Sequence, residues 1–382
     1  MLRRTGTVLL LITFFAVYVL CSTSIIHPVR AGTVIVPDDY LTIQEAVDHA
    51  NVGDTVFVRA GLYSEPVTVR KTLWLAGENR ETTVLNGTTI DPMVIVEADN
   101  VKISGFTLEG WSFNNIIING TTGAVIFDNK IAFNAMGILV ENSTNTTIEK
   151  NVIEGFGLDN IGIMLDYSSE CRITNNTITN GVYDGVRLRF SDHNLITRNV
   201  ISENDYGIYL DESKENTISE NAVSENGNVG INFEVSCSNN TVVHNNFVNN
   251  YGHVRFWDSQ TNVWDDASTG NYWSNITFVD LFIGPHQNLT GSDGIGDSPY
   301  VIDEKNSDRY PLMKPWMPVA TVGDINHDGS VNILDIVSIA SIYGCREGEL
   351  GWNPKADLAP PYDLINMPDL VTAARHYGEA HP

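Results

Sequence analysis

The sequence predicts an all-β fold, a right-handed parallel β-helix, followed by a small α-helical calcium-binding domain. Two columns of residues recur along the chain with one shared period of 22–25 residues. Within each repeat, apolar and polar residues alternate with the period of two that is typical of β-strands. Near the C-terminus, a twelve-residue loop rich in Asp, Asn and Gly precedes an amphipathic segment, which is the pattern of a calcium loop.

The first column is a glycine followed by alternating apolar residues, and the second is an asparagine. The glycines are Gly137, Gly162, Gly185, Gly207 and Gly230, with a looser copy at Gly252, at spacings of 25, 23, 22, 23 and 22. The asparagines are Asn129, Asn151, Asn176, Asn199, Asn221 and Asn246, at spacings of 22, 25, 23, 22 and 25. Two independent columns with one period indicate a solenoid in which each repeat is one coil.

Residues 194–210 show one complete repeat. The alternation in 194–201 and again in 207–210 indicates short strands joined by turns. Stacked coils would bury their Ile, Val and Leu residues in one continuous core. An Asn at the same turn of every coil can form a hydrogen-bonded ladder. The β-branched alternation excludes leucine-rich and α-helical solenoids.

A solenoid needs a cover at each end. Residues 42–50 predict a short amphipathic helix with Ile43, Ala46, Val47 and Ala50 on the face that would cover the first coil. We expect six segments: a signal peptide (1–31), an N-terminal cap with the first coils (32–100), the β-helix repeats (101–264), a C-terminal cap (265–314), a linker (315–322) and the calcium-binding domain (323–382).

The N-terminus and the charge predict a secreted or cell-surface protein. Arg3 and Arg4 precede an apolar run, residues 8–20, that is short for a membrane span, and residues 29–31 resemble a signal cleavage site. An uncleaved signal is the alternative, and it is the one route to membrane contact. The formal net charge of −25 repels phosphates, which argues against nucleic acid as a partner.

Cysteine usage gives no framework for the fold. Once a signal is removed, Cys171, Cys237 and Cys345 remain, an odd number without the spacing of a metal site. Cys171 and Cys237 are about three coils apart, too far for a disulfide at roughly 4.8 Å per stacked strand. We therefore expect packing and hydrogen bonds, not disulfides, to hold the fold.

The predicted calcium loop spans residues 324–335. Its ligands are Asp324, Asn326, Asp328, the backbone carbonyl of Ser330, Asn332 and Asp335, with Gly329 at the sharp turn. Ca²⁺ takes six to eight oxygen ligands, and alternating Asp and Asn side chains can fold inward around it. A helix should follow, with Ile336, Ile339, Ala340 and Tyr343 on one face. The predicted cofactor is Ca²⁺.

Several motifs carry a family resemblance. The Asn/Ile/Gly coils, "NVWDD" with "GNYW", "DGIGDSPYVID" and "DRYPL" resemble the NosD-type β-helix family, within the group of carbohydrate-binding and sugar-hydrolysing β-helices. Residues 42–67 are similar to the start of pectin-degrading β-helices. The resemblance implies a pectate-lyase-like solenoid over about residues 33–315. It does not imply one activity, because one fold hosts many functions.

The C-terminal segment resembles a type I dockerin, which pairs two loop–helix units. The second unit, residues 357–377, has one residue too many in its loop and lacks oxygen side chains at positions three and five. The resemblance implies a cohesin-type protein module as partner. The alternative is a calcium-stiffened module without a partner.

Outward positions of the strand after each column glycine form a polar stripe. Glu141, Asp166, Arg189, Asp211 and Glu234 lie along it, and Met164, Arg187, Tyr209 and Asn232 lie beside it. Asp166 and Asp211, flanking Arg187 and Arg189, are the candidate catalytic residues, because paired carboxylates perform glycoside hydrolysis and similar β-helix enzymes use Arg as a base. The alternative is a solvated face of cross-strand charge pairs.

We therefore predict an exported protein that binds polysaccharide, tethered through the dockerin-like module. Whether it also cleaves the polysaccharide, as a lyase or a glycoside hydrolase, stays open. A non-catalytic structural or adhesive surface protein is the first alternative. A copper-related factor of the NosD type is the second, and no Cys/Met/His cluster in the sequence favours it. Tyr209 and Trp257 are candidates for stacking on sugars, whereas Trp264 and Trp273 are expected to pack under the C-terminal cap.

Overall fold

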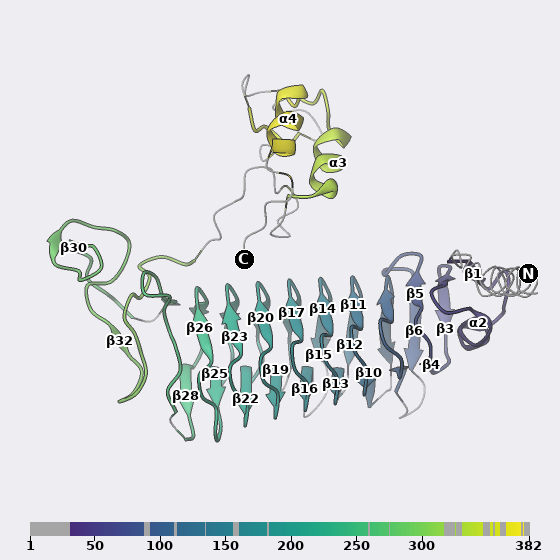
Figure 1. Ribbon diagram of the computed structural model, residues 1–382, viewed down its shortest axis with the longest axis horizontal. Coiled ribbons are helices and arrows are strands. Elements are labelled where there is room, and N and C mark those ends of the chain that lie inside the picture. Colours follow the sequence, from purple (N-terminus) through teal and green to yellow (C-terminus); the bar gives the residue numbers. More distant parts are fainter. Residues whose placement is uncertain are drawn as a thin grey trace, which may run out of the picture.

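A computed structural model shows a long parallel β-solenoid and a small helical module (Figure 1). It describes residues 31–87, 92–110, 113–133, 135–155, 160–181, 183–258, 260–274, 276–316, 325, 331–346, 352–353, 356–359, 364–375 and 377. The predicted signal peptide lies, apart from residue 31, outside the described residues. No helix within the described ranges combines the length and apolar character needed to span a bilayer.

Three parallel sheets, here named A, B and C, form the sides of the solenoid, and the chain visits them in that order in each coil. Sheet A contains β1 (Thr33–Val36), β2 (Thr55–Val58), β5 (Trp74–Gly77), β8 (Lys102–Ser104), β11 (Val125–Phe127), β14 (Thr147–Glu149), β17 (Arg172–Thr174), β20 (Leu195–Thr197), β23 (Thr217–Ser219) and β26 (Thr241–Val243). Sheet B contains β3 (Gly61–Tyr63), β6 (Thr83–Gly87), β9 (Thr107–Gly110), β12 (Lys130–Phe133), β15 (Val152–Gly155), β18 (Thr177–Thr179), β21 (Val200–Ser202), β24 (Ala222–Ser224), β27 (Asn246–Val248) and β29 (Tyr272–Trp273). Sheet C contains β4 (Val67–Val69), β7 (Val94–Val96), β10 (Asn114–Asn119), β13 (Met136–Glu141), β16 (Ile161–Asp166), β19 (Asp184–Arg189), β22 (Tyr206–Asp211), β25 (Val229–Phe233) and β28 (Gly252–Phe256).

The core is a set of aliphatic columns, as the periodicity predicts. In sheet A, Ile126 pairs with Ile148 and the column continues through Ile173, and all three are buried. The column glycines lie at the starts of the sheet C strands. A Cβ on Gly162 would meet the carbonyl oxygen of Gly185 at 2.6 Å, so only glycine fits this close approach.

The predicted asparagine ladder is present and buried. Each side-chain Nδ2 donates to the Oδ1 of the next asparagine at 2.9–3.1 Å along Asn129, Asn151, Asn176, Asn199, Asn221, Asn245 and Asn271. Assigning Asn246 to this ladder was wrong. Asn245 occupies the position, and Asn246 instead makes two hydrogen bonds to the backbone of Trp316.

Two further ladders follow other turns. One runs through Asn194, Asn216, Asn240 and Asn262, and the other through Asn204, Asn226 and Asn250. These amides satisfy turn carbonyls that water cannot reach, which a buried backbone requires.

Both ends of the solenoid are covered. Helix α2 (Ile43–His49) begins after the N-cap Thr42 and buries Ile43, Ala46 and Val47, as predicted. At the other end Trp264 and Trp273 are both 1% exposed and pack on aromatic residues of the last coils. The short strand pairs β30 (Phe282–Ile283) with β31 (Leu289–Thr290), and β32 (Tyr300–Val301) with β33 (Ser307–Asp308), complete the C-terminal cap.

The C-terminal module has a core of its own. Helices α3 (Ile333–Ser341) and α4 (Met367–Arg375) pack around Ile325, Ile339, Ala356, Ile365 and Ala373. Helix α3 ends before Tyr343, which was expected to continue its apolar face, and Tyr343 is exposed. Helix α4 likewise ends before Tyr377, which is also exposed.

Of the predicted calcium ligands, Asp324, Asn326, Asp328 and Ser330 lie outside the described residues. Asn332 is the N-cap of α3, and Asp335 is buried and accepts hydrogen bonds from the backbone of Ile325 and Asn332. Asp369 makes the equivalent contacts to Leu358 and Asn366 in the second unit. The two loop–helix units of the module therefore have the same local arrangement of hydrogen bonds around a buried aspartate.

Candidate functional site

The outer face of sheet C carries polar and aromatic residues in columns. In one column the strand register aligns Met164, Arg187, Tyr209, Asn232 and Arg255. In a second, at the strand starts, it aligns Ile161, Asp184 and Tyr206. The predicted stripe is the third, aligning Asp166, Arg189 and Asp211.

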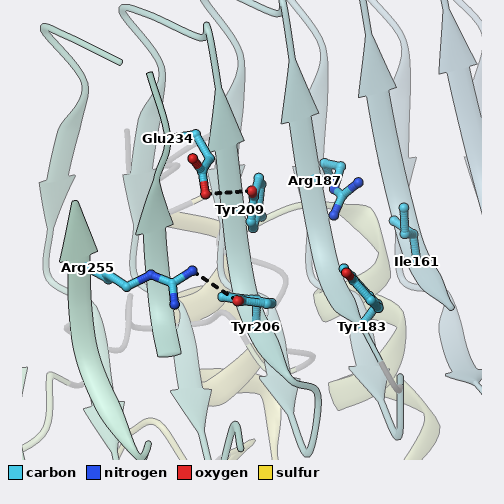
Figure 2. Close-up of a pocket in the computed structure, with 7 residues that line it drawn as sticks. All are labelled: Ile161, Tyr183, Arg187, Tyr206, Tyr209, Glu234 and Arg255. Carbon is cyan, nitrogen blue, oxygen red and sulfur yellow. Dashed lines mark hydrogen bonds between the residues drawn. The ribbon is translucent and has the colours of Figure 1, made fainter. Parts of the chain in front are cut away.

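The first two columns border a pocket of about 520 Å³, which is within the usual range for ligand sites. Figure 2 shows its lining side chains, contributed by successive coils: Ile161, Tyr183, Arg187, Tyr206, Tyr209, Glu234 and Arg255. The pocket extends from β16 to β28, four strand spacings, or roughly 19 Å at 4.8 Å per strand. It is a groove along the solenoid axis.

Hydrogen bonds fix the polar groups at one end of the groove. The Tyr209 hydroxyl donates to Glu234 Oε1 at 2.7 Å (Figure 2). Arg255 donates through Nη2 to the Tyr206 hydroxyl at 2.9 Å and through Nε to Asn232 Oδ1 at 2.7 Å. Burial and the Glu234 carboxylate raise the pKa of Tyr209, so its hydroxyl stays protonated and acts as a donor.

Both arginines stack on tyrosine rings. The Arg187 guanidinium carbon is 4.7 Å from the Tyr209 ring centre and 5.6 Å from that of Tyr183. Arg255 lies 5.0 Å from the ring centre of Tyr206. Cation–π contacts hold a guanidinium in place without using all of its N–H donors.

A buried carboxyl group lies beneath the groove. Asp184 is fully buried and forms an ion pair with Arg187. Burial raises the pKa of Asp184 to about 7, although the positive charge of Arg187 opposes the shift. The charge near the floor of the groove therefore changes around neutral pH.

Of the four predicted catalytic residues, Arg187 lines the pocket. Arg189 binds Asp166 with two contacts, Nε to Oδ1 at 2.8 Å and Nη2 to Oδ2 at 2.5 Å. Burial and the charge of Glu234 raise the pKa of Asp211, while Arg187 and Arg189 oppose this. The structure thus places Asp166 in an ion pair with Arg189, and the charge of Glu234, which lines the pocket, acts on Asp211. A catalytic role for the four residues stays a prediction.

Sequence reasoning missed Tyr183, Asp184, Tyr206 and Arg255. The first three lie at or just before the start of a strand, one or two residues ahead of the column glycine, where the alternation has not yet begun. Arg255 follows the looser glycine, Gly252, and its register with Asn232 would have revealed it.

These features define a parallel β-helix protein with a ligand-sized groove on the outer face of one sheet. The chain belongs to the NosD family: the model of that family, described as periplasmic copper-binding protein (NosD), matches residues 48–277.

The chain is similar to one relative in sequence and to two solved structures, of which the alginate lyase agrees with this fold. A cell surface glycoprotein from Methanothermus fervidus is 27% identical over 308 residues, covering 62% of this chain and 51% of the relative. The chain thus spans about half the length of that relative. The crystal structure of alginate lyase from Paenibacillus sp. str. FPU-7 has a TM-score of 0.51 at 14% identity, covering 61% of this chain and 97% of that one. A Family 28 exopolygalacturonase of Yersinia enterocolitica has a TM-score of 0.43 at 10% identity, over 64% of this chain and 68% of that one.

The family description raises the question of copper. In the described ranges, no group of three or more His, Cys, Asp and Glu side chains could hold a metal ion. Burial raises the pKa of Cys171 and of Cys237 to about 11, so both thiols stay protonated at neutral pH. The ring of His253 is buried against Phe247 and Trp273. The described part of this chain does not fit a copper centre.

Proposed function

We propose that this is an exported surface protein whose β-helix binds a polysaccharide along the groove on sheet C. The observation that carries the proposal is the row of Arg187, Arg255 and three tyrosines along that groove. The name of the Methanothermus relative, a cell surface glycoprotein, supports the predicted location.

The side chains suit a sugar polymer that carries carboxylates. Tyrosine rings can cover the apolar faces of pyranose rings, and arginines bind carboxylates through paired N–H donors. Glu234 lines the groove and offers an acceptor for hydroxyl groups. A groove of roughly 19 Å along the axis accommodates several sugar residues in extended form.

Cleavage is the second candidate function, and one observation favours it. The pKa of Asp211 is raised partly by the charge of Glu234, which lines the groove. Two nearby carboxyl groups with different proton affinities can divide the roles of acid and base. In this version Asp211 acts as the acid and Glu234 as the base. The assignment with Asp166 as partner of Asp211 is the competing one.

Arg255→Ala tests the binding proposal. We expect the variant to bind an acidic hexasaccharide, such as hexagalacturonate or an alginate hexamer, at least tenfold more weakly, because an arginine–carboxylate contact contributes about 1.5–3 kcal/mol. Isothermal titration calorimetry measures the affinity. Arg70→Ala is the control, since Arg70 is a surface arginine that pairs with Glu97 away from the groove.

Equal affinity in wild type and Arg255→Ala would place the site elsewhere. A wild type that binds no glycan would favour the structural surface protein. Release of unsaturated uronates or reducing ends in the same mixtures would show an enzyme, and Asp211→Asn, Asp166→Asn and Glu234→Gln would then separate the two acid–base assignments. Copper retained through dialysis would revive the copper-related alternative.

We further propose that the C-terminal module binds Ca²⁺ through Asp324, Asn326, Asp328, the Ser330 carbonyl, Asn332 and Asp335, and that it tethers the protein to a cohesin-type module. The buried, backbone-bonded carboxylates of Asp335 and Asp369 support two related loop–helix units. Asn332 and Asp335 together cap α3, so the last ligands of the loop are built into the start of the helix.

Chelation of Ca²⁺ is expected to expose residues 323–378 to protease while the β-helix stays resistant. Asp324→Ala should reproduce this effect, because it removes the first ligand of the complete loop. Asp357→Ala is the matched control, since it removes the first position of the degenerate loop. Limited proteolysis with mass spectrometry measures both, and a cleavage pattern indifferent to chelator would contradict the calcium proposal.

A further inference from the structure

A second pocket of about 520 Å³ lies on a different face of the β-helix, where sheet A turns into sheet B. Its walls come from β5, β8 and β11 and the turns that follow them. The lining residues that matter are Trp74, Glu78, Arg80, Glu81, Phe127 and Asp128. None of them lines the groove on sheet C.

Two stacked glycines bring the backbones of successive coils close together at this corner. A Cβ on Gly77 would lie 2.1 Å from the carbonyl oxygen of Gly105, and a Cβ on Gly105 would lie 2.4 Å from that of Gly77. Gly105 also has a φ of 79°, in the left-handed region that favours glycine. Both glycines line the pocket, so they contribute backbone and no side chain to its surface.

Trp74 forms an aromatic wall in a fixed orientation. Its Nε1 donates to Ser104 Oγ at 2.9 Å, and its ring lies 6.1 Å from that of Phe127. The residue nevertheless remains 40% exposed. An indole whose polar edge is already bonded within the protein presents an apolar surface to a ligand, and covering that surface is favourable.

The polar groups around the ring are mostly acceptors. Arg80 Nη1 binds Asp128 Oδ1 at 2.9 Å, and Arg80 Nε binds Glu81 Oε1 at 3.3 Å. Glu78 accepts one hydrogen bond, from the backbone of Ala60. Across the described residues, the second oxygen of each of these three carboxylates makes no hydrogen bond or ion pair, which leaves acceptors for hydroxyl groups.

We infer that this pocket is a second carbohydrate site, specific for an uncharged pyranose. Three carboxylates against one guanidinium repel a uronate, whereas an aromatic wall beside hydroxyl acceptors suits a neutral hexose. The groove on sheet C carries the opposite preference through its two arginines. The inference stands on its own residues and does not depend on the function proposed for the groove.

Calorimetric titration of the full chain with neutral hexasaccharides of glucose, mannose and galactose tests this site. We expect at least one to bind, Trp74→Ala to weaken that binding at least tenfold, and Glu81→Gln to weaken it about threefold. Tyr251→Ala is the matched control, because Tyr251 is an aromatic residue that is 88% exposed and lines neither pocket. Circular dichroism verifies that each variant is folded.

A substitution in one site should leave ligand binding at the other site unchanged. Trp74→Ala is expected to leave hexagalacturonate binding unchanged, and Arg255→Ala to leave neutral-sugar binding unchanged. The inference is overturned if wild type binds no neutral hexasaccharide, or if it binds only a cationic glucosamine hexamer. Unchanged neutral binding in folded Trp74→Ala and in Glu81→Gln also overturns it. Since Glu81 is a surface side chain, Glu81→Gln keeps the test valid if Trp74→Ala does not fold.

Discussion

Replacing Asn199 with alanine is expected to lower the free energy of unfolding by about 3–5 kcal/mol, because several buried groups lose their partners at once. Asn199 Oδ1 accepts hydrogen bonds from the backbone N–H and the side-chain amide of Asn176, at 2.9 and 3.0 Å. Its Nδ2 donates to the carbonyls of Ile173 and Thr197 and to Asn221 Oδ1. Asn199 is 1% exposed, so water cannot replace these bonds.

Urea unfolding followed by circular dichroism measures the loss, with calorimetry to test whether the β-helix unfolds in one step. Asn119→Ala provides the control. Asn119 is an exposed residue at the end of β10, and its substitution should change stability by less than about 0.5 kcal/mol. Similar stabilities for Asn199→Ala and Asn119→Ala would mean that the ladder is not a major source of stability.

The ladder shows both the reach and the limit of sequence periodicity. The first ladder was predictable because its spacing matches that of the glycine column. The last asparagine of the predicted column was misassigned because Asn245 and Asn246 both fit a variable period, and only the strand register distinguishes them. The ladder through Asn194 ends in a bond from Asn262 to Asn306, which lies 44 residues further on. Asn306 belongs to the C-terminal cap and not to a repeat, so the periodicity could not predict it.

The groove was predictable only in part for a related reason. The alternation identifies which residues of a strand point outward, and it found Arg187 and Tyr209. It does not reveal the direction in which a long side chain extends across the neighbouring coils. Arg255 reaches Tyr206, 49 residues earlier in the chain, and Arg189 turns towards Asp166 in the preceding coil. Such choices depend on packing at distances that the sequence pattern does not encode.

At pH 8, Asp184→Asn is expected to be more stable than the wild type, by up to about 4 kcal/mol. Folding raises the pKa of Asp184 from 3.8 to about 7, so the folded state prefers the protonated carboxyl. The stability that Asp184 contributes is therefore fully present below about pH 4 and is lost as the pH rises through 7. Asparagine has nearly the same shape and does not titrate, so the difference between the two proteins should shrink towards pH 4.

Unfolding by urea at pH 5, 6, 7 and 8 gives the difference directly, and Asp258→Asn, an exposed substitution, should show a small and constant difference. If the wild type were instead the more stable protein at pH 8, the pair of ionised Asp184 with Arg187 would be net stabilising, and folding would not raise the pKa of Asp184. The protonation of Asp184 should also affect ligand binding in the groove. Below pH 7 protonated Asp184 no longer neutralises Arg187, so the wild type should bind an acidic hexasaccharide more tightly at pH 6 than at pH 8, whereas Asp184→Asn should lose most of that pH dependence.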